Sequence, residues 1–217
     1  MPRTEPTSVA IAVFARAPIP GQAKTRLIPR LGAQGAAELQ RWLLRRTLET
    51  AVAARLGPVS LWCAPSREHP VFAACREERG LELFEQRGGD LGARMLHAFS
   101  ALCPQGPVLL IGTDCPALSI AALRRAAAAL REGRDAVLIP AEDGGYVMIG
   151  LHRAEPRLFD AMPWGTGGVM TATRRRLREL GWRWAEPKTL WDVDRPEDFN
   201  RLRASGLLDD GFNEAGV

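Results

Sequence analysis

The feature that most constrains the fold of this chain is a repeated alternation of short, almost wholly apolar segments with longer amphipathic ones. Strands with apolar residues at successive positions are covered on both faces, as parallel strands are in α/β sheets. Repeated strand–helix–strand order therefore predicts a doubly wound, mostly parallel sheet between two layers of helices. We expect strands at 9–15, 59–64, 81–85, 108–112, 136–140 and 146–151, and helices at 36–55, 70–79, 91–102, 120–132, 167–180 and 196–204.

The length of 217 residues suggests one α/β domain over 1–217, and we expect 1–8 and 206–217 to be flexible ends. Apolar residues make up 46% and charged residues 25%, which is typical of a globular protein and argues against disorder. The longest apolar runs, such as 108–112, are far shorter than the ~20 residues of a membrane span. No membrane span is therefore expected.

The N-terminus and the cysteines predict a cytoplasmic protein. The polar segment 1–8 lacks the apolar stretch of a secretory signal. Four scattered cysteines form no C-x-x-C pair and are expected to be reduced thiols. The net charge of +4 comes from arginines spread along the chain, which suits a phosphate-bearing ligand but predicts no nucleic-acid partner. The sequence leaves the oligomeric state open.

Cationic and glycine residues gather directly after the first expected strand. Gly21 lets the backbone approach a ligand closely, and Arg16, Lys24 and Arg26 can neutralise a diphosphate or triphosphate. The segment lacks the G-x-x-x-x-G-K-[ST] pattern, so it is not a P-loop. The alternative is a solvated basic loop without a ligand.

Acidic residues follow the fourth expected strand and precede the last expected helix. Asp114 comes shortly after the run 108–112 and is expected to hold a divalent cation opposite the basic loop, because Mg²⁺ prefers oxygen ligands. The alternative role, capping the next helix, is better filled by Ser119. In the cluster 192–198, Glu197 and Asp198 suit a helix start, which leaves one of the two earlier aspartates able to reach a metal.

Three glycine-rich segments complete the candidate site. Residues 88–95 open a helix whose exposed amides could bind an anion or a base, although Asp90 could simply cap that helix. Residues 143–146 form a tight turn with a carboxylate that could deprotonate an acceptor, and 164–168 bring a tryptophan that could stack or pack. The three histidines share no metal-ligand or triad spacing, so zinc and serine-hydrolase sites are excluded.

Together these motifs resemble the DUF2064 family, which has the nucleotide-diphospho-sugar transferase (glycosyltransferase A, GT-A) fold. The resemblance implies a three-layer α/β/α domain with a mostly parallel mixed sheet, a Rossmann-like nucleotide-binding half and a more variable acceptor half. The matching segments are FARAPIPGQAKTRL at 14–27, GGDLGARM at 88–95, IGTDCPAL at 111–118, PAEDGGYVMIGL at 140–151, WGTGGV at 164–169 and DVDRPEDF at 192–199.

The resemblance also implies roles for single residues. Asp114 matches the metal-binding aspartate at the end of the nucleotide-binding half, although the first acid of the common Asp-x-Asp motif is absent because Gly112 stands there. Asp194 resembles a second metal aspartate and Arg94 a nucleotide-contacting arginine. The expected site comprises catalytic Asp143 and Lys24; nucleotide-binding Arg16, Gly21, Lys24, Thr25, Arg26, Gly89, Asp90 and Arg94; metal-binding Asp114 and Asp194; and acceptor-side Glu142, Gly144, Gly145, Tyr146, Trp164 and Thr166.

The leading hypothesis is a glycosyltransferase that uses a nucleotide sugar and Mg²⁺ or Mn²⁺, with Asp143, or less favourably Glu142, as the base on a small-molecule acceptor. One alternative is a nucleotidyltransferase that joins an NTP to a phosphorylated acceptor and releases pyrophosphate. Another is a nucleotide-binding protein without turnover. The base, the sugar, the acceptor and the stereochemical outcome are not specified by the sequence.

Overall fold

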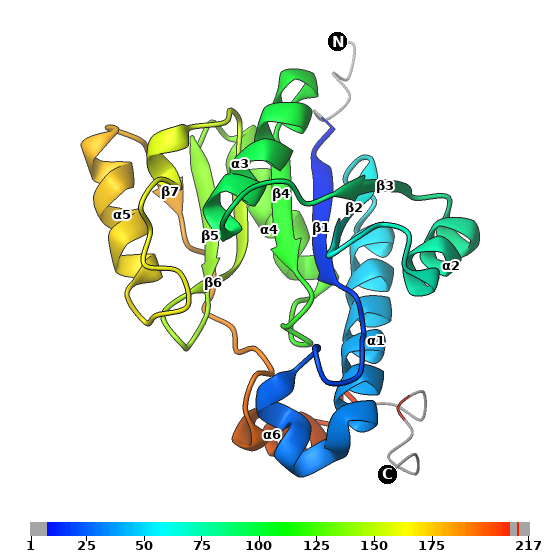
Figure 1. Cartoon of the computed structure of the whole chain (residues 1–217). Coiled ribbons are helices and arrows are strands. Elements are labelled where there is room, and N and C mark those ends of the chain that lie inside the picture. The colour runs from blue at the N-terminus through cyan, green and yellow to red at the C-terminus, as the bar shows by residue number, and fades with distance from the viewer. Residues whose placement is uncertain (1–7, 209–211, 213–217) are drawn as a thin grey trace.

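The computed structural model describes residues 8–208 and 212 and contains one mixed sheet flanked by helices (Figure 1). The end segments expected to be flexible, 1–8 and 206–217, therefore lie mostly outside the described residues. The strands are β1 (Ala10–Arg16), β2 (Val59–Ala64), β3 (Glu82–Glu85), β4 (Val108–Gly112), β5 (Ala136–Pro140), β6 (Tyr146–Leu151) and β7 (Trp184–Ala185). The α-helices are α1 (Ile28–Ala54), α2 (Pro70–Arg79), α3 (Leu91–Leu102), α4 (Ile120–Arg131), α5 (Val169–Glu179) and α6 (Pro196–Ala204), with 3₁₀ turns η1 (Thr25–Leu27), η2 (Cys103–Gln105) and η3 (Pro156–Leu158).

The sheet has the strand order β3-β2-β1-β4-β6-β5-β7. Strand β6 runs antiparallel to β4 and β5, and the other pairings are parallel. The prediction of a mostly parallel mixed sheet is thus confirmed, and the six expected strands are present with ends within one residue. The two-residue β7 was not predicted.

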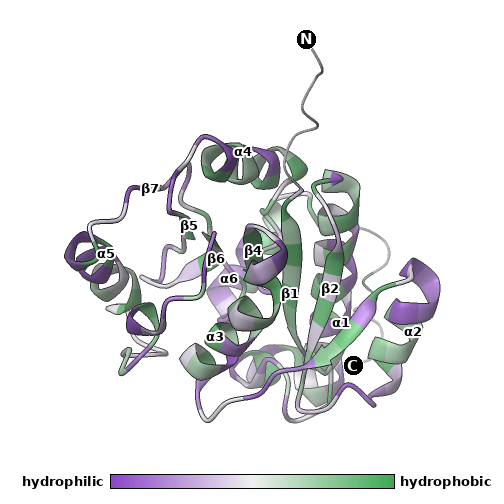
Figure 2. Ribbon diagram, turned by 90° about the horizontal axis from the view of Figure 1, so that it is seen from above, coloured by the Kyte–Doolittle hydropathy of each residue, from purple (hydrophilic) through white to green (hydrophobic). Residues whose placement is uncertain are grey.

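Side chains of successive strand residues point into two separate cores. In β1, Ile11 and Val13 pack with α1, α2 and α4, whereas Ala12 and Phe14 pack with α3 and α5 on the opposite face. Figures 1 and 2 show these helices on the two sides of the sheet, with hydrophobic strands between them. This alternation is the structural reason for the uninterrupted apolar runs, because both faces of the central strands are buried.

A third core lies beyond the carboxyl ends of β1 and β4. There, Leu27 and Trp42 pack with Val193, Phe199 and Leu202, so that η1, the first turns of α1 and α6 form one unit. Helix α1 starts at Ile28 rather than at 36, and Gly32 breaks its helical geometry with φ of 68°. This early start was missed because Gly32 interrupts the helical pattern. The first turn of α1 brings the basic loop toward α6.

Several predicted helix ends are confirmed by their hydrogen bonds. Ser119 accepts from the Ala122 amide at 3.2 Å, and Asp90 accepts from the Ala93 amide at 2.8 Å. Gly133 follows α4 with φ of 85°. In residues 8–208 and at 212, no helix is both long and apolar enough to cross a membrane.

Candidate active site

The loops after β1, β4 and β5 meet the segment before α6 around a cleft of about 350 Å³. In Figure 1 these connections gather beneath the sheet, near α6. A neighbouring hollow of about 330 Å³ continues past Glu142 and Asp198. Ligands of open α/β sheets bind beyond the carboxyl ends of the strands, so this position fits a functional site. The cleft is lined by Arg26, Leu91, Gly112, Asp114, Cys115, Ala141, Asp143, Gly145, Tyr146, Val147, Trp164, Gly165, Thr166, Val169, Asp192 and Asp194.

The basic turn contacts the acidic segments directly. The ammonium of Lys24 lies 2.5 Å from Oδ1 of Asp114 and donates to the carbonyl of Val193 at 2.6 Å. Gly21, with φ of 79°, and Lys24, with φ of 48°, both adopt left-handed geometry. This geometry turns the chain back toward β4, so that the Lys24 side chain is only 5% exposed while Asp114 remains 54% exposed. The expected meeting of Lys24 and Asp114 is therefore present.

A second ion pair joins Arg26 to Asp194 at the rim of the cleft. Both side chains are largely exposed, and both line the cleft. The structure thus brings four of the expected residues together, with one cation beside each predicted metal-binding aspartate. The exposed pair of Arg26 with Asp194 contributes little to stability.

The segment that carries Asp194 also brings Asp192 to the cleft, a residue that was not selected from the sequence. Val193 is fully buried in the third core, and its amide donates to the Asp114 carbonyl at 2.8 Å. Residues two apart in an extended segment point to the same side, so Asp192 and Asp194 both line the cleft. The Asp-Val-Asp spacing was the signal that could have identified Asp192.

Among the carboxyl groups that line the cleft, that of Asp192 has the most strongly shifted pKa. Burial is the main cause that raises the pKa of Asp192 to about 6, and the negative charges of Asp143 and Asp114 contribute, with Lys24 acting in the opposite direction. Desolvation and neighbouring like charges both disfavour an ionised carboxyl. The cleft therefore concentrates negative charge that its own cations balance only in part.

The donor set fits a divalent cation that is shared with a ligand. Among residues 8–208 and 212, no three His, Cys, Asp or Glu side chains are grouped so that they alone could hold a metal ion. Mg²⁺ commonly takes only one or two carboxylates and completes its shell with phosphate oxygens and water. Asp114 and Asp194 could each supply one such oxygen ligand beside the basic turn.

The turn between β5 and β6 forms the side of the cleft on which an acceptor is expected. Oδ1 of Asp143 accepts from the Gly145 amide at 2.8 Å, which fixes the carboxylate at the surface of the turn. Gly144 has φ of 89°, and a Cβ there would overlap the Gly167 carbonyl. The Gly144 carbonyl in turn accepts from the Met170 amide at 2.8 Å, so this turn is anchored to the start of α5.

Glu142 is engaged differently from Asp143. Its two carboxylate oxygens accept from Arg201 of α6 at 2.6 and 3.1 Å, and this pairing lowers the pKa of Glu142. The guanidinium of Arg201 also lies over the Trp191 ring at 4.6 Å. Glu142 therefore joins the acceptor-side turn to α6, which makes Asp143 the better candidate for a base.

Aromatic and apolar side chains line the other part of the cleft. The rings of Tyr146 and Trp164 meet edge to face, with centroids 6.3 Å apart. Burial raises the pKa of Tyr146, whose hydroxyl contacts Met95 at 3.8 Å. Thr166 uses its hydroxyl within its own loop, donating to Pro163 at 2.8 Å and accepting from the Gly168 amide at 3.2 Å. Tyr146, Trp164 and Thr166 thus line the cleft, and their contacts with an acceptor stay predictions.

The remaining expected nucleotide-binding residues lie outside the lining of the cleft. Arg16 is exposed at the end of β1, and Thr25 is exposed in η1. Arg94 donates to the Gly88 carbonyl at 3.2 Å, which ties it to its own loop, and Asp90 caps α3. Their proposed contacts with a nucleotide, together with that of Gly89, stay predictions. Leu91, next to this loop, does line the cleft and was not selected from the sequence.

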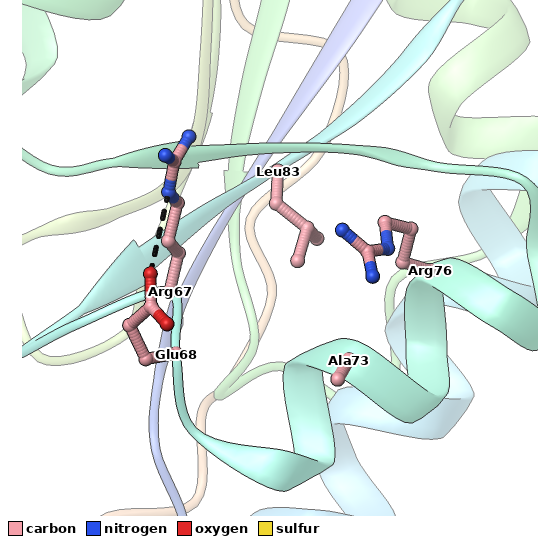
Figure 3. Close-up of a pocket in the computed structure, with 5 residues that line it drawn as sticks. All are labelled: Arg67, Glu68, Ala73, Arg76 and Leu83. Carbon is pink, nitrogen blue, oxygen red and sulfur yellow. Dashed lines mark ion pairs between the residues drawn. The ribbon is translucent and has the colours of Figure 1, made fainter.

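A separate hollow of about 300 Å³ lies at the outer edge of the sheet, between α2 and β3 (Figure 3). Figure 3 shows the guanidinium groups of Arg67 and Arg76 apart from one another, with Leu83 between them. Arg67 pairs with Glu68 at 4.0 Å. Because its polar groups do not converge, this hollow is a poorer candidate than the cleft beneath β1 and β4.

Comparisons with known proteins point to transferases that use nucleotides. The model of a family described as "Uncharacterized protein conserved in bacteria (DUF2064)" matches residues 47–166. None of the curated proteins matches the chain. A protein from Desulfovibrio desulfuricans G20, provisionally described as a nucleotide-diphospho-sugar transferase, is 27% identical over 96% of this chain and 94% of its own, with a TM-score of 0.84.

Two more distant structures share the fold alone. CMP:2-keto-3-deoxy-manno-octonic acid synthetase, solved with CTP, is 12% identical over 91% of this chain and 98% of its own, with a TM-score of 0.58. Glucosyl-3-phosphoglycerate synthase from Mycobacterium tuberculosis, solved with Mn²⁺, UDP and glucosyl-3-phosphoglycerate, is 11% identical over 93% of this chain and 77% of its own, with a TM-score of 0.56. The expected nucleotide-diphospho-sugar transferase fold is thereby confirmed.

Proposed function

The chain belongs to the DUF2064 family, and on that premise we propose that it is a metal-dependent glycosyltransferase that uses a nucleotide-sugar donor. The observation that carries this proposal is the meeting of Lys24 and Arg26 with Asp114 and Asp194 at the mouth of the cleft. Such a pairing of cations with metal-binding acids suits a diphosphate, whose oxygens need both amide or ammonium donors and a divalent cation. The 27% identical relative supports a sugar-nucleotide donor.

In the proposed reaction, the bond between the anomeric carbon of the sugar and the diphosphate breaks, and a bond to an acceptor oxygen forms. Lys24 and Arg26 hold the diphosphate, Gly21 lets the backbone approach it, and Gly89 to Arg94 help to place the nucleoside. Asp143 receives the proton of the acceptor hydroxyl. Asp114 and Asp194 would hold Mg²⁺ or Mn²⁺, which supplies positive charge for the departing nucleoside diphosphate when bound.

The decisive experiment measures nucleoside diphosphate release from a panel of nucleotide sugars, with Mg²⁺, with Mn²⁺ and with a chelator. We expect release that requires the metal and that falls about 100-fold or more in Asp114→Asn, because this carboxylate acts where charge develops. The matched control is Glu179→Gln, which removes an exposed carboxylate on α5 and should leave release unchanged. Equal activity of Asp114→Asn and the control would contradict the proposal.

The same panel separates the alternatives. Pyrophosphate release from an NTP and a sugar phosphate would favour a nucleotidyltransferase. Metal-independent binding of nucleotides, detected as a rise in melting temperature that Asp114→Asn does not change, would favour a nucleotide-binding protein without turnover.

A further inference from the structure

The charge of the cleft limits what can bind beside the donor. Four aspartates line it, whereas Arg26 is the one cationic side chain among its described lining residues. Arg26 and Lys24 pair with Asp194 and Asp114, and in the proposed reaction both cations are taken up by the donor diphosphate. In the described part of the chain, no ion pair joins Asp143 or Asp192 to a cation. Like charges brought together suppress the wrong partner, so a second anion beside the diphosphate is disfavoured.

The remaining wall of the cleft is apolar and partly exposed. Leu91 is 44% exposed and is one of two large hydrophobic side chains that are exposed in the described residues. It lines the cleft with Tyr146, Val147, Trp164 and Val169. Apolar side chains that gather in a cleft beside convergent polar groups are typical of ligand sites.

This apolar wall is fixed in place by close backbone contacts. A Cβ at Gly92 would lie 2.6 Å from the Phe159 carbonyl and 2.9 Å from the Trp164 indole. The absence of a side chain at Gly92 thus lets the loop that carries Trp164 pack directly on α3. Together with the contact between Gly144 and Gly167, this packing shapes the wall before a ligand arrives.

We propose that the acceptor is uncharged or cationic and presents an apolar face to Leu91 and Trp164, and that acceptors carrying a phosphate or carboxylate are rejected. This inference rests on the proposed glycosyl transfer and names the class of its acceptor. The hydroxyl that accepts the sugar lies toward Asp143, and its proton passes to that carboxylate as the nucleoside diphosphate leaves. Such a cleft differs from one that takes a phosphorylated sugar.

The test uses matched acceptor pairs with the donor that gives turnover. Phenyl β-glucoside, its 6-phosphate and methyl β-glucoside are compared by acceptor-stimulated nucleoside diphosphate release and by the mass of the product. We expect kcat/KM for phenyl β-glucoside to exceed that for its 6-phosphate by on the order of 100-fold and that for methyl β-glucoside by about 10-fold. Leu91→Ala should reduce the phenyl-over-methyl preference.

The matched control is Val52→Ala, which truncates the other exposed large hydrophobic residue, on α1, and should leave both ratios unchanged. Equal or better use of the 6-phosphate, with donor turnover intact, overturns the acceptor inference and leaves the glycosyltransferase proposal standing. Loss of the phenyl preference in Val52→Ala to the same extent as in Leu91→Ala would also overturn it. Failure to release nucleoside diphosphate from any donor, with water or with an acceptor, overturns both proposals.

Discussion

Gly144 shows, at the level of a single residue, how closely the turn between β5 and β6 packs against its neighbours. Its positive φ and its contact with Gly167 allow no side chain. Gly144→Ala should lower the free energy of unfolding by about 2 to 4 kcal/mol, because it combines backbone strain with overlap on another backbone segment. Chemical denaturation measures this loss. Gly89→Ala is the control, since nothing lies within 4 Å of a Cβ there and its φ is not positive, and a comparable loss in Gly89→Ala would contradict the explanation.

Residues of the candidate site could be predicted from the sequence where a local pattern identifies them. Asp114 and Lys24 follow strands whose carboxyl ends are expected at one edge of the sheet, and β1 pairs with β4 in the structure. The contact of Arg201 with Glu142 joins residues 59 positions apart and had no local signal. Leu91 was missed because an exposed leucine at a helix start is indistinguishable in sequence from one that packs.

At the scale of elements, one partly buried ion pair joins α5 to the residue that directly follows β7. Arg174 donates to Glu186 at 2.6 and 2.9 Å, and Trp184 donates to the same carboxylate at 2.8 Å. These hydrogen bonds, led by that from Arg174, lower the pKa of Glu186. A carboxyl with a lowered pKa in the folded state stabilises the protein above its unfolded-state pKa, and this stabilisation is lost as the pH falls through the folded-state value.

Glu186→Gln should therefore reduce the free energy of unfolding by about 0.5 to 1 kcal/mol at pH 7, a value that allows for the partial exposure of the pair. The difference from the unmodified protein should shrink below about pH 4, near the unfolded-state pKa of glutamate. Urea unfolding at several pH values measures it. Glu179→Gln, which breaks an exposed pair on α5, should change stability by less than about 0.3 kcal/mol at each pH. A difference in Glu186→Gln that grows on acidification would refute the assigned role.

The order and bounds of most elements followed from apolar patterning, whereas the position of one strand in the sheet did not. Strand–helix–strand order implies parallel pairing, yet β6 enters between β4 and β5 as an antiparallel strand. The tight turn at 143–145 was recognised, but a hairpin alone does not specify which neighbour its second strand will join. Strand β7 is too short to leave an apolar run, because it spans only Trp184–Ala185.

At the scale of the whole molecule, the third core connects the basic loop with the acidic segment. Leu27 from η1 and Val193 lie in the same cluster as Phe199 of α6, so the two sides of the candidate diphosphate site share one hydrophobic support. Disturbing this core should weaken ligand binding as well as stability. The other two cores lie on the two faces of the sheet.

Phe199→Leu should lower the free energy of unfolding by about 1 to 1.5 kcal/mol and weaken nucleotide-sugar binding about 5- to 10-fold, since small displacements of binding groups carry large penalties. The control is Phe72→Leu, at an equally buried phenylalanine in the first core. It should cost similar stability but retain affinity. Calorimetric titration of folded protein and urea unfolding provide the two values, and parallel loss of affinity in both variants would show that the third core has no special connection to binding.

The buried valine between two cleft-facing aspartates has a consequence for how the chain avoids misassembly. If the segment before α6 shifted by one position, Val193 would face the cleft and one of the two aspartates would take its buried place in the third core, where an unpaired carboxylate is costly. Such a displaced arrangement is energetically unfavourable. Residues 192–194 therefore fix the register of the segment before α6, and they also carry two of the aspartates that line the cleft.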